Sequence, residues 1–426
     1  MNAIQEFLAP IIFVACLMLI INSKWFFTSK SISKKVLLVG FSLKAFSAIL
    51  FGFLYKSRIL AGGDTFMYFN DGNIIYNALK EDPFVYFKLA IGTNDFTPVP
   101  PYLLPYTDAM HFWFDSSNYF LVRINAIIRP FSFGVYNVHA LVFAFLSFIG
   151  TYTLYLFFEN KVYSKKILQF ILFGIPSIVF WTSGVHKEAI VIFALGIILY
   201  NLDIILQNSF RKRNLFFALF GLIVLGYTRI YILAFLLPFL AAIIIYNKYE
   251  SARISFKFFV LTILVFGAAA FLVDILSDQH SLMYEFLVRR EYFINSPGNM
   301  TFQVERIPHN FHGALLLIWE AIINPFIRPL PKDCNIFLAY LASFETFILL
   351  LVIVILAFTV NKKSILNNPY AIFSILFGLS ILFLIGLIVN NSGAIVRYRS
   401  IAIPFILIGF CLKSRDMKIS SLFSKN

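Results

Sequence analysis

The sequence predicts an all-α polytopic membrane protein, and its composition and apolar segments both support this fold class. Of the 426 residues, 60% are hydrophobic and only 13% are charged, and the mean hydropathy is +0.83. A water-soluble fold of this size does not bury that much apolar surface, so most of the chain is expected in lipid. About eleven apolar segments are long enough to cross a hydrocarbon core of about 30 Å.

The predicted transmembrane helices belong to one integral membrane domain. In order, they cover residues 5–22, 36–55, 136–158, 167–182, 188–206, 214–228, 231–246, 258–275, 336–360, 370–389 and 398–412. Because no basic residue precedes the first apolar segment, we expect that segment to be a retained membrane helix and not a cleaved signal peptide.

Basic residues gather in the short loops between alternate helices. Nineteen Lys or Arg and three Asp or Glu fall in the intervals 23–35, 159–166, 207–213, 247–257, 361–369 and the tail from 413. Because basic loops stay in the cytoplasm, we expect a bacterial inner (plasma) membrane protein with its N-terminus outside and its C-terminus in the cytoplasm. This topology accounts for the net charge of +14, so no nucleic-acid partner is expected.

The longest extracytoplasmic interval, 56–135, lies between the first two helices (1–55) and a six-helix core (136–275). Hydrophobic residues recur there at helical spacing, which predicts a helix along the membrane surface over 64–88. Prolines then predict an ordered loop over 97–106, followed by a second amphipathic helix over 117–129.

A second extracytoplasmic interval, 276–335, precedes the three C-terminal helices and the cytoplasmic tail (336–426). Its apolar piece, 313–325, is too short for a full crossing and would reverse the topology of everything after it. We therefore expect it to be re-entrant or interfacial.

Asp64 is the candidate catalytic residue. Gly62 and Gly63 precede it and allow the backbone to turn sharply after a membrane helix. On the predicted helix, Tyr68 lies one turn after Asp64, and Asp71 shares its face. A carboxylate at the water-side end of a membrane helix is suited to act as a base on a lipid-borne substrate. The alternative is that Asp64 only caps the helix by accepting a backbone N–H.

Polar clusters occupy the outer ends of several other predicted helices. The candidate binding residues there are His186, Lys187, Glu188, Arg229, Arg328, Arg397 and Arg399. Four of them, Lys187, Arg229, Arg397 and Arg399, are expected to form a basin for phosphate, with Arg making bidentate contacts and Lys acting as a point charge. The alternative is that they are ordinary interfacial anchors that reach lipid headgroups.

Two charged residues lie deep in predicted spans. Counting along the helices places Lys44 and Glu345 at a similar depth, and an isolated charge there is costly. We therefore expect them to pair.

The sequence assigns no cofactor. The three cysteines lie far apart, and the histidines lack the spacing of a zinc site. No metal site is therefore assigned. Neither a P-loop nor a Rossmann fingerprint occurs, so no nucleotide site is expected. Whether a divalent cation takes part stays open.

The layout around Gly62-Gly-Asp64, with the interval that follows to Arg129, resembles the GT-C superfamily of membrane glycosyltransferases. That resemblance implies a long extracytoplasmic first loop with two surface helices, an acidic catalytic residue and a sugar donor carried on polyprenyl phosphate. Arg58, the spacing from Gly62 to Tyr68 and the late Arg397-Tyr-Arg399 are also similar to bacterial exopolysaccharide and O-antigen polymerases, which join lipid-linked repeat units.

The expected reaction transfers a hexosyl or pentosyl group to a cell-envelope glycan, lipid or protein. The protein itself is expected to contact membrane lipids. The donor phosphate would lie against the cations named above, and Asp64 would deprotonate the acceptor hydroxyl while Asp71 or Glu188 orients it. A lipid-linked sugar transporter or flippase is the alternative of another class. Such proteins place polar residues near the midplane, whereas the clusters here gather at helix ends.

Overall fold

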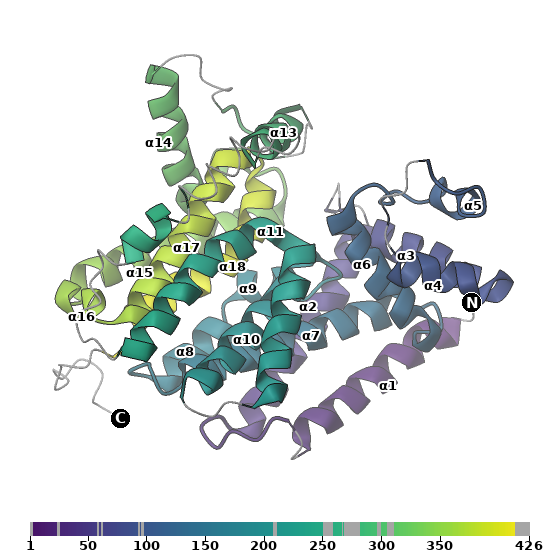
Figure 1. Cartoon of the computed structure of the whole chain (residues 1–426), viewed down its shortest axis with the longest axis horizontal. Helices are drawn as coiled ribbons and strands as arrows, with labels where there is room; N and C mark the ends of the chain where they lie inside the picture. The colour runs from purple at the N-terminus through teal and green to yellow at the C-terminus, as the bar shows by residue number, and fades with distance from the viewer. Residues whose placement is uncertain are drawn as a thin grey trace. The chain divides into compact units, whose positions relative to one another are not determined.

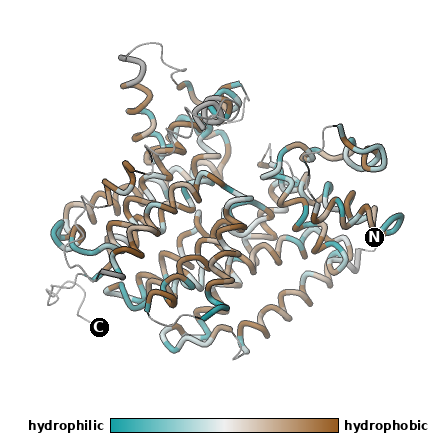
Figure 2. Tube along the Cα trace, in the orientation of Figure 1, coloured by the Kyte–Doolittle hydropathy of each residue, from teal (hydrophilic) through white to brown (hydrophobic). Residues whose placement is uncertain are grey.

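The computed structural model describes residues 3–23, 26–57, 59–60, 63–92, 94, 98–207, 211–249, 259–265, 267, 282–295, 300–304 and 311–413. Regular structure within these ranges is helical, and isolated bridges are the only extended pairings they contain. Hydrophobic residues run along the long helices (Figure 2). The all-α fold class is therefore confirmed.

Seven helices in the described ranges are long and apolar enough to cross a membrane. They are α2 (Lys34–Lys56), α7 (Tyr136–Phe158), α10 (Lys187–Leu206), α11 (Lys212–Tyr249), α15 (Phe337–Thr359), α17 (Pro369–Ile388) and α18 (Ser392–Phe410). A membrane protein is thus supported, while the count of eleven crossings and the orientation of the termini stay predictions.

The chain divides into two compact units. The first comprises Met1–Phe157, Val179–Ile205 and Phe210–Ile230, and the second comprises Phe158–Ile178, Leu206–Ser209 and Tyr231–Asn426. Figure 1 labels the helices of both.

Aromatic side chains fill the core of the first unit between α2, α7 and the loop that follows α1 (Ala3–Asn22). Phe27 from this loop packs against Tyr152 with ring centroids 4.8 Å apart. Phe41 of α2 meets Phe148 of α7 at 5.6 Å. Burying such rings supplies much of the driving force that aligns these helices.

The predicted surface helix over 64–88 is wrong as a single element. The structure has α3 (Thr65–Glu81) and α4 (Pro83–Ile91) instead. Pro83 lacks an N–H and fits the first turn of a new helix, and the Asp82 carboxylate caps that helix by accepting from the Phe84 N–H at 2.8 Å.

The other parts of the interval follow the sequence more closely. The proline-rich loop contains a single helical turn, α5 (Leu104–Thr107). The second amphipathic helix is α6 (Ser116–Ile128), which continues into the short η1 (Arg129–Phe131). Here the structure confirms the predicted helix to within a residue at each end.

The predicted span 167–182 is not one continuous helix. It consists of α8 (Lys165–Phe173) and α9 (Pro176–Trp181). Gly174 ends α8 and Pro176 begins α9, because Pro favours the first helical position and disrupts a helix interior. The irregular backbone after α9 leads into α10.

A break inside α11 separates the two halves predicted as spans 214–228 and 231–246. Arg229 has the non-helical backbone angles φ −150° and ψ 78°. The sequence places a tight turn at this residue, and the structure places the break there.

The second unit also contains α13 (Leu282–Asn295), α14 (Phe311–Ile327), η2 (Pro331–Asp333) and α16 (Lys362–Leu366). Its core includes Phe377 of α17 and Phe405 of α18, with ring centroids 5.0 Å apart. The segment 313–325 lies in α14, and its re-entrant placement stays a prediction. Of the predicted span 258–275, residues 259–265 and 267 are helical, and the rest lies outside the described residues.

Two glycines let α7 and α10 approach closely. A Cβ atom on Gly196 would overlap the carbonyl oxygen of Gly150, and one on Gly150 would overlap the backbone of Phe193. Small residues at a helix interface allow this kind of contact in membranes.

We expect Gly196→Ala to destabilise the protein, by about 1–3 kcal/mol as for other overpacked cores. Gly267→Ala is the matched control, because a Cβ there meets nothing within 4 Å and alanine is the better helix former. Thermal unfolding of the purified protein in detergent is the measurement. Equal effects of the two substitutions would contradict the close packing of α7 on α10.

Candidate functional site

Asp64 lies at the start of α3 but does not cap it through its side chain. Its backbone is helical, and its carboxylate accepts no capping hydrogen bond. The neighbouring Gly63 packs against the ring of Tyr55, where a Cβ would overlap the ring. This contact places the residue before Asp64 against α2, and the Asp64 side chain is partly exposed. The alternative of a simple helix cap is therefore not what the structure contains.

Tyr68 connects Asp64 to the start of α6. Its hydroxyl donates to Asn118 Oδ1 at 2.8 Å and makes a longer contact of 3.5 Å with Asp64 Oδ2. The buried Tyr68 ring thus has its hydroxyl beside the carboxylate. Asp64 is only loosely held, because a contact of 3.5 Å is at the limit of a hydrogen bond.

The Asn118 amide is itself held in place by the cap of α6. Asp115 accepts from the backbone N–H groups of Ser117 at 3.1 Å and Asn118 at 3.0 Å, as an N-cap residue does. Asn118 Nδ2 donates to Asp115 Oδ2 at 2.8 Å, which directs Oδ1 toward Tyr68. Sequence analysis missed Ser117 and Asn118, although Asp115-Ser-Ser-Asn118 before an apolar stretch is a recognisable start of a helix.

Asp71 is fully buried and serves a neighbouring loop. Its Oδ2 accepts from the backbone N–H groups of His111 and Phe112, both at 3.0 Å, and its Oδ1 lies 3.1 Å from His111 Nδ1. The loop held in this way places the Phe112 ring 4.9 Å from the ring of Tyr68. The predicted role of Asp71 in orienting an acceptor stays a prediction. In the structure, both of its carboxylate oxygens contact residues of this loop.

Glu188 joins two other predicted site residues. Its Oε2 lies 2.9 Å from His186 Nδ1, and its Oε1 accepts from Arg229 Nη2 at 2.8 Å. The Glu188 side chain is fully buried, and the Arg229 side chain is 11% exposed. The sequence places His186 and Glu188 in one turn and Arg229 in another, and the structure brings the three into one hydrogen-bonded chain.

Arg229 reaches Glu188 because of the break in α11. A regular helix would hold the backbone at residue 229 in helical geometry, whereas its extended angles turn the chain at the level of the α10 N-terminus. The buried ion pair compensates for the desolvation of both charges.

Lys187 is bound to the same helix end that holds Asn118. Its Nζ donates to Ser117 Oγ at 2.8 Å, and the residue is 7% exposed. Lys187 is therefore a mostly buried cation and not a side chain extended into headgroups, which argues against the anchor alternative at this position.

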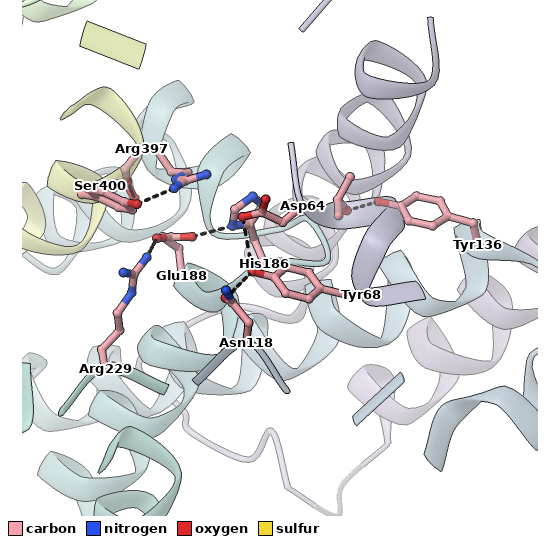
Figure 3. Close-up of polar contacts among 11 residues, drawn as sticks. Asp64, Tyr68, Asn118, Tyr136, His186, Glu188, Arg229, Arg397 and Ser400 are labelled. Atoms are coloured by element: carbon pink, nitrogen blue, oxygen red, sulfur yellow. Dashed lines mark hydrogen bonds and ion pairs between the residues drawn. The ribbon is translucent and has the colours of Figure 1, made fainter. Parts of the chain in front are cut away.

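Figure 3 includes residues that the first unit brings together, namely Asp64, Tyr68, Asn118, His186, Glu188 and Arg229. The His186 ring lies edge-on to Tyr68 with centroids 6.4 Å apart, so the Asp64–Tyr68 contact and the His186–Glu188–Arg229 chain are adjacent. Arg58 lies outside the described residues. The hydroxyls of Thr65 and Tyr136 are 2.5 Å apart and tie α3 to α7.

The remaining predicted cations belong to the second unit, where Arg328 pairs with Asp333. Arg328 Nη1 lies 2.6 Å and 2.7 Å from the two carboxylate oxygens. Burial raises the pKa of Asp333, but hydrogen bonds from Arg328 and from the Leu330 N–H outweigh it, so the pKa lies below its ordinary value. This pair contributes stability above the ordinary pKa, and the contribution is lost as the pH falls through the lowered one.

Arg399 is buried in α18, and both of its Nη atoms have hydrogen-bond partners in the second unit. Its guanidinium donates to the Arg328 carbonyl at 2.7 Å and to the Thr346 hydroxyl. The guanidinium of Arg397 lies 4.5 Å from the ring of Tyr398. α18 begins at Ser392, so both arginines are within the helix and not at its start. Their predicted role in binding phosphate stays a prediction.

Lys44 and Glu345 each have partners within their own unit. Lys44 Nζ donates to Ser147 Oγ at 2.8 Å and to Thr182 Oγ1 at 2.7 Å. Glu345 Oε1 accepts from the Ser177 backbone N–H at 3.0 Å. We expected Lys44 and Glu345 to pair because burying an isolated charge is costly. In the structure, the hydrogen bonds above compensate for the burial of each charge, and the Lys44–Glu345 pair stays a prediction.

Neither a metal site within the described residues nor a known relative assigns a role to the candidate residues. The described residues contain no cluster of three or more His, Cys, Asp or Glu side chains that could hold a metal ion. No protein-family model, curated protein or solved structure matches the chain.

The Glu188–Arg229 pair predicts a strong coupling. Because removing one partner leaves an uncompensated buried charge, we expect Glu188→Gln to cost about 3–5 kcal/mol of unfolding free energy. Arg229→Met in the Glu188→Gln background should cost less than it does in the wild type, by about 0.5–3 kcal/mol. Denaturant unfolding in detergent provides the double-mutant cycle, with exposed Glu6→Gln as the control. Additive effects would refute the ion pair.

Proposed function

We propose that this protein is a membrane glycosyltransferase. It transfers a sugar from a polyprenyl-phosphate carrier to a cell-envelope glycan, lipid or protein on the extracytoplasmic face. The observation that carries the proposal is the loosely held carboxylate of Asp64 beside a buried chain of polar and cationic side chains at the ends of membrane helices.

Asp64 is the proposed general base. A base must be able to reach the hydroxyl that it deprotonates, and Asp64 is partly exposed, whereas Asp71 and Glu188 are fully buried. Deprotonation of the acceptor as it attacks the anomeric carbon, opposite the leaving phosphate, corresponds to inverting chemistry. The Tyr68 hydroxyl, 3.5 Å away, is placed to orient the carboxylate.

Lys187 and Arg229 are the proposed phosphate-binding residues of the first unit. Negative charge grows on the phosphate as the glycosidic bond breaks, and fixed cations in a partly dehydrated site stabilise it strongly. Glu188 holds Arg229 and His186 in place, so we assign it to positioning the cations and not to the acceptor. The proposal extends to Arg328, Arg397 and Arg399 only as sequence-based predictions.

One observation favours a second candidate, a lipid-linked sugar flippase. Transporters often have broken helices and polar groups near the midplane. The chain has irregular backbone after α9, where the Thr182 hydroxyl accepts from Lys44. A flippase moves its substrate between leaflets without forming a glycosidic bond, so the two functions predict different products.

Asp64→Asn should abolish the glycan product in cells that lack the wild-type protein, because general acid–base catalysis contributes about 10²–10⁴-fold. Asp82→Asn is the matched control, since Asp82 acts as a helix cap and Asn caps equally well. The measurement is a profile of cell-envelope glycans at equal protein level.

The glycan profile separates the alternatives. Unchanged glycans in the Asp64→Asn strain would overturn the enzyme proposal. Single repeat units without long chains would indicate a polymerase. Lipid-linked sugar that accumulates on the cytoplasmic leaflet would indicate a flippase.

A further inference from the structure

Lys44 lies too deep in its membrane helix to reach water. It is ten residues from Lys34 and twelve from Lys56, the ends of α2, which corresponds to roughly 15 and 18 Å at 1.5 Å per residue. A lysine side chain can snorkel only from near a helix end. Lys44 is also 1% exposed, so its ammonium depends on protein partners.

Those partners are two neutral hydroxyl groups, Ser147 on α7 and Thr182 after α9. No carboxylate forms an ion pair with Lys44 in the part of the chain that the structure describes. Hydroxyls compensate a buried ammonium less well than a carboxylate does. A charge kept at such a cost in a membrane span suggests a functional reason.

The backbone from Thr182 to His186 is irregular and buried. Irregular backbone at membrane depth persists only where protein surrounds it and satisfies its polar groups. This segment ends at His186, directly before α10, so its course determines where the His186–Glu188–Arg229 chain lies.

The segment follows one face of α2. Lys44 holds its beginning through Thr182. Phe51, two turns further along α2, holds its end: the ring packs against Gly184, where a Cβ would overlap it, and lies edge-on to His186 with centroids 5.4 Å apart. The Lys44 and Phe51 contacts together fix both ends of the segment.

We infer that Lys44 is a positioning residue, whose ammonium holds the segment 182–186 and through it the site residues His186 and Glu188. An ammonium has three N–H donors and so serves Ser147 and Thr182 at once, which a neutral apolar side chain does not. The link to activity rests on the proposed function, whereas the link to the position of His186 does not.

The test measures how quickly diethyl pyrocarbonate modifies individual histidines in the full-length protein in detergent, by peptide mass spectrometry. His186 is 1% exposed, and the modification rate of a buried group follows its local opening. In Lys44→Met we expect His186 to react roughly ten-fold faster, because two hydrogen bonds that hold the segment are lost.

The chain supplies its own controls. Lys56→Met makes the same chemical change at an exposed position of α2 and should leave His186 unchanged. His139 is fully buried between Asn125 and Ser132, so it reports general unfolding and should stay protected in Lys44→Met. The half-exposed His111 should react at the same rate in all variants.

Thr182→Val removes the hydroxyl that accepts from Lys44 on the segment and should reproduce the change at His186. Equal protection of His186 in Lys44→Met and the wild type would overturn the inference, and so would parallel exposure of His139. If His186 is exposed as expected but Lys44→Met leaves the glycans unchanged, the positioning role stands and the proposed function fails.

Discussion

The buried carboxylate of Glu188 is the group on which the site in the first unit depends. It accepts from His186 and from Arg229, which lies 41 residues further along the chain. Inside a membrane protein, neither charge of this ion pair is stable without the other. The break in α11, the beginning of α10 and the buried segment before it are all consistent with a chain that must bring these three side chains together.

Much of the fold follows from elementary patterns. Long apolar segments predict α2, α7, α10, α15, α17 and α18, because a helix satisfies all of its backbone hydrogen bonds within one segment and crosses lipid with about 20 apolar residues. The charged turn around Arg229 predicts the break in α11. The divisions at Pro83 and at Gly174 to Pro176 were equally visible as helix breakers, but hydrophobic periodicity continued across them and suggested continuous helices.

The site could be predicted only in part. Sequence indicated which polar residues lie at helix ends, and several of these meet in the first unit. It did not indicate how each carboxylate is used, because the partners of Asp71 are backbone N–H groups 40 and 41 residues away. The partners of Lys44 are likewise hydroxyls on distant elements, and such contacts depend on packing and not on local pattern.

The three carboxylates near the site therefore differ in what remains available for chemistry. Asp71 accepts two backbone N–H groups and contacts His111, and Glu188 uses both of its oxygens on His186 and Arg229. A buried carboxylate whose oxygens already accept from protein donors is not within hydrogen-bond reach of an acceptor hydroxyl, which a general base requires. Asp64 alone among the three combines partial exposure with a single long contact. The division arises from packing: the two buried groups give the surroundings a fixed geometry, and the third keeps the partly exposed carboxylate that the proposed general base requires.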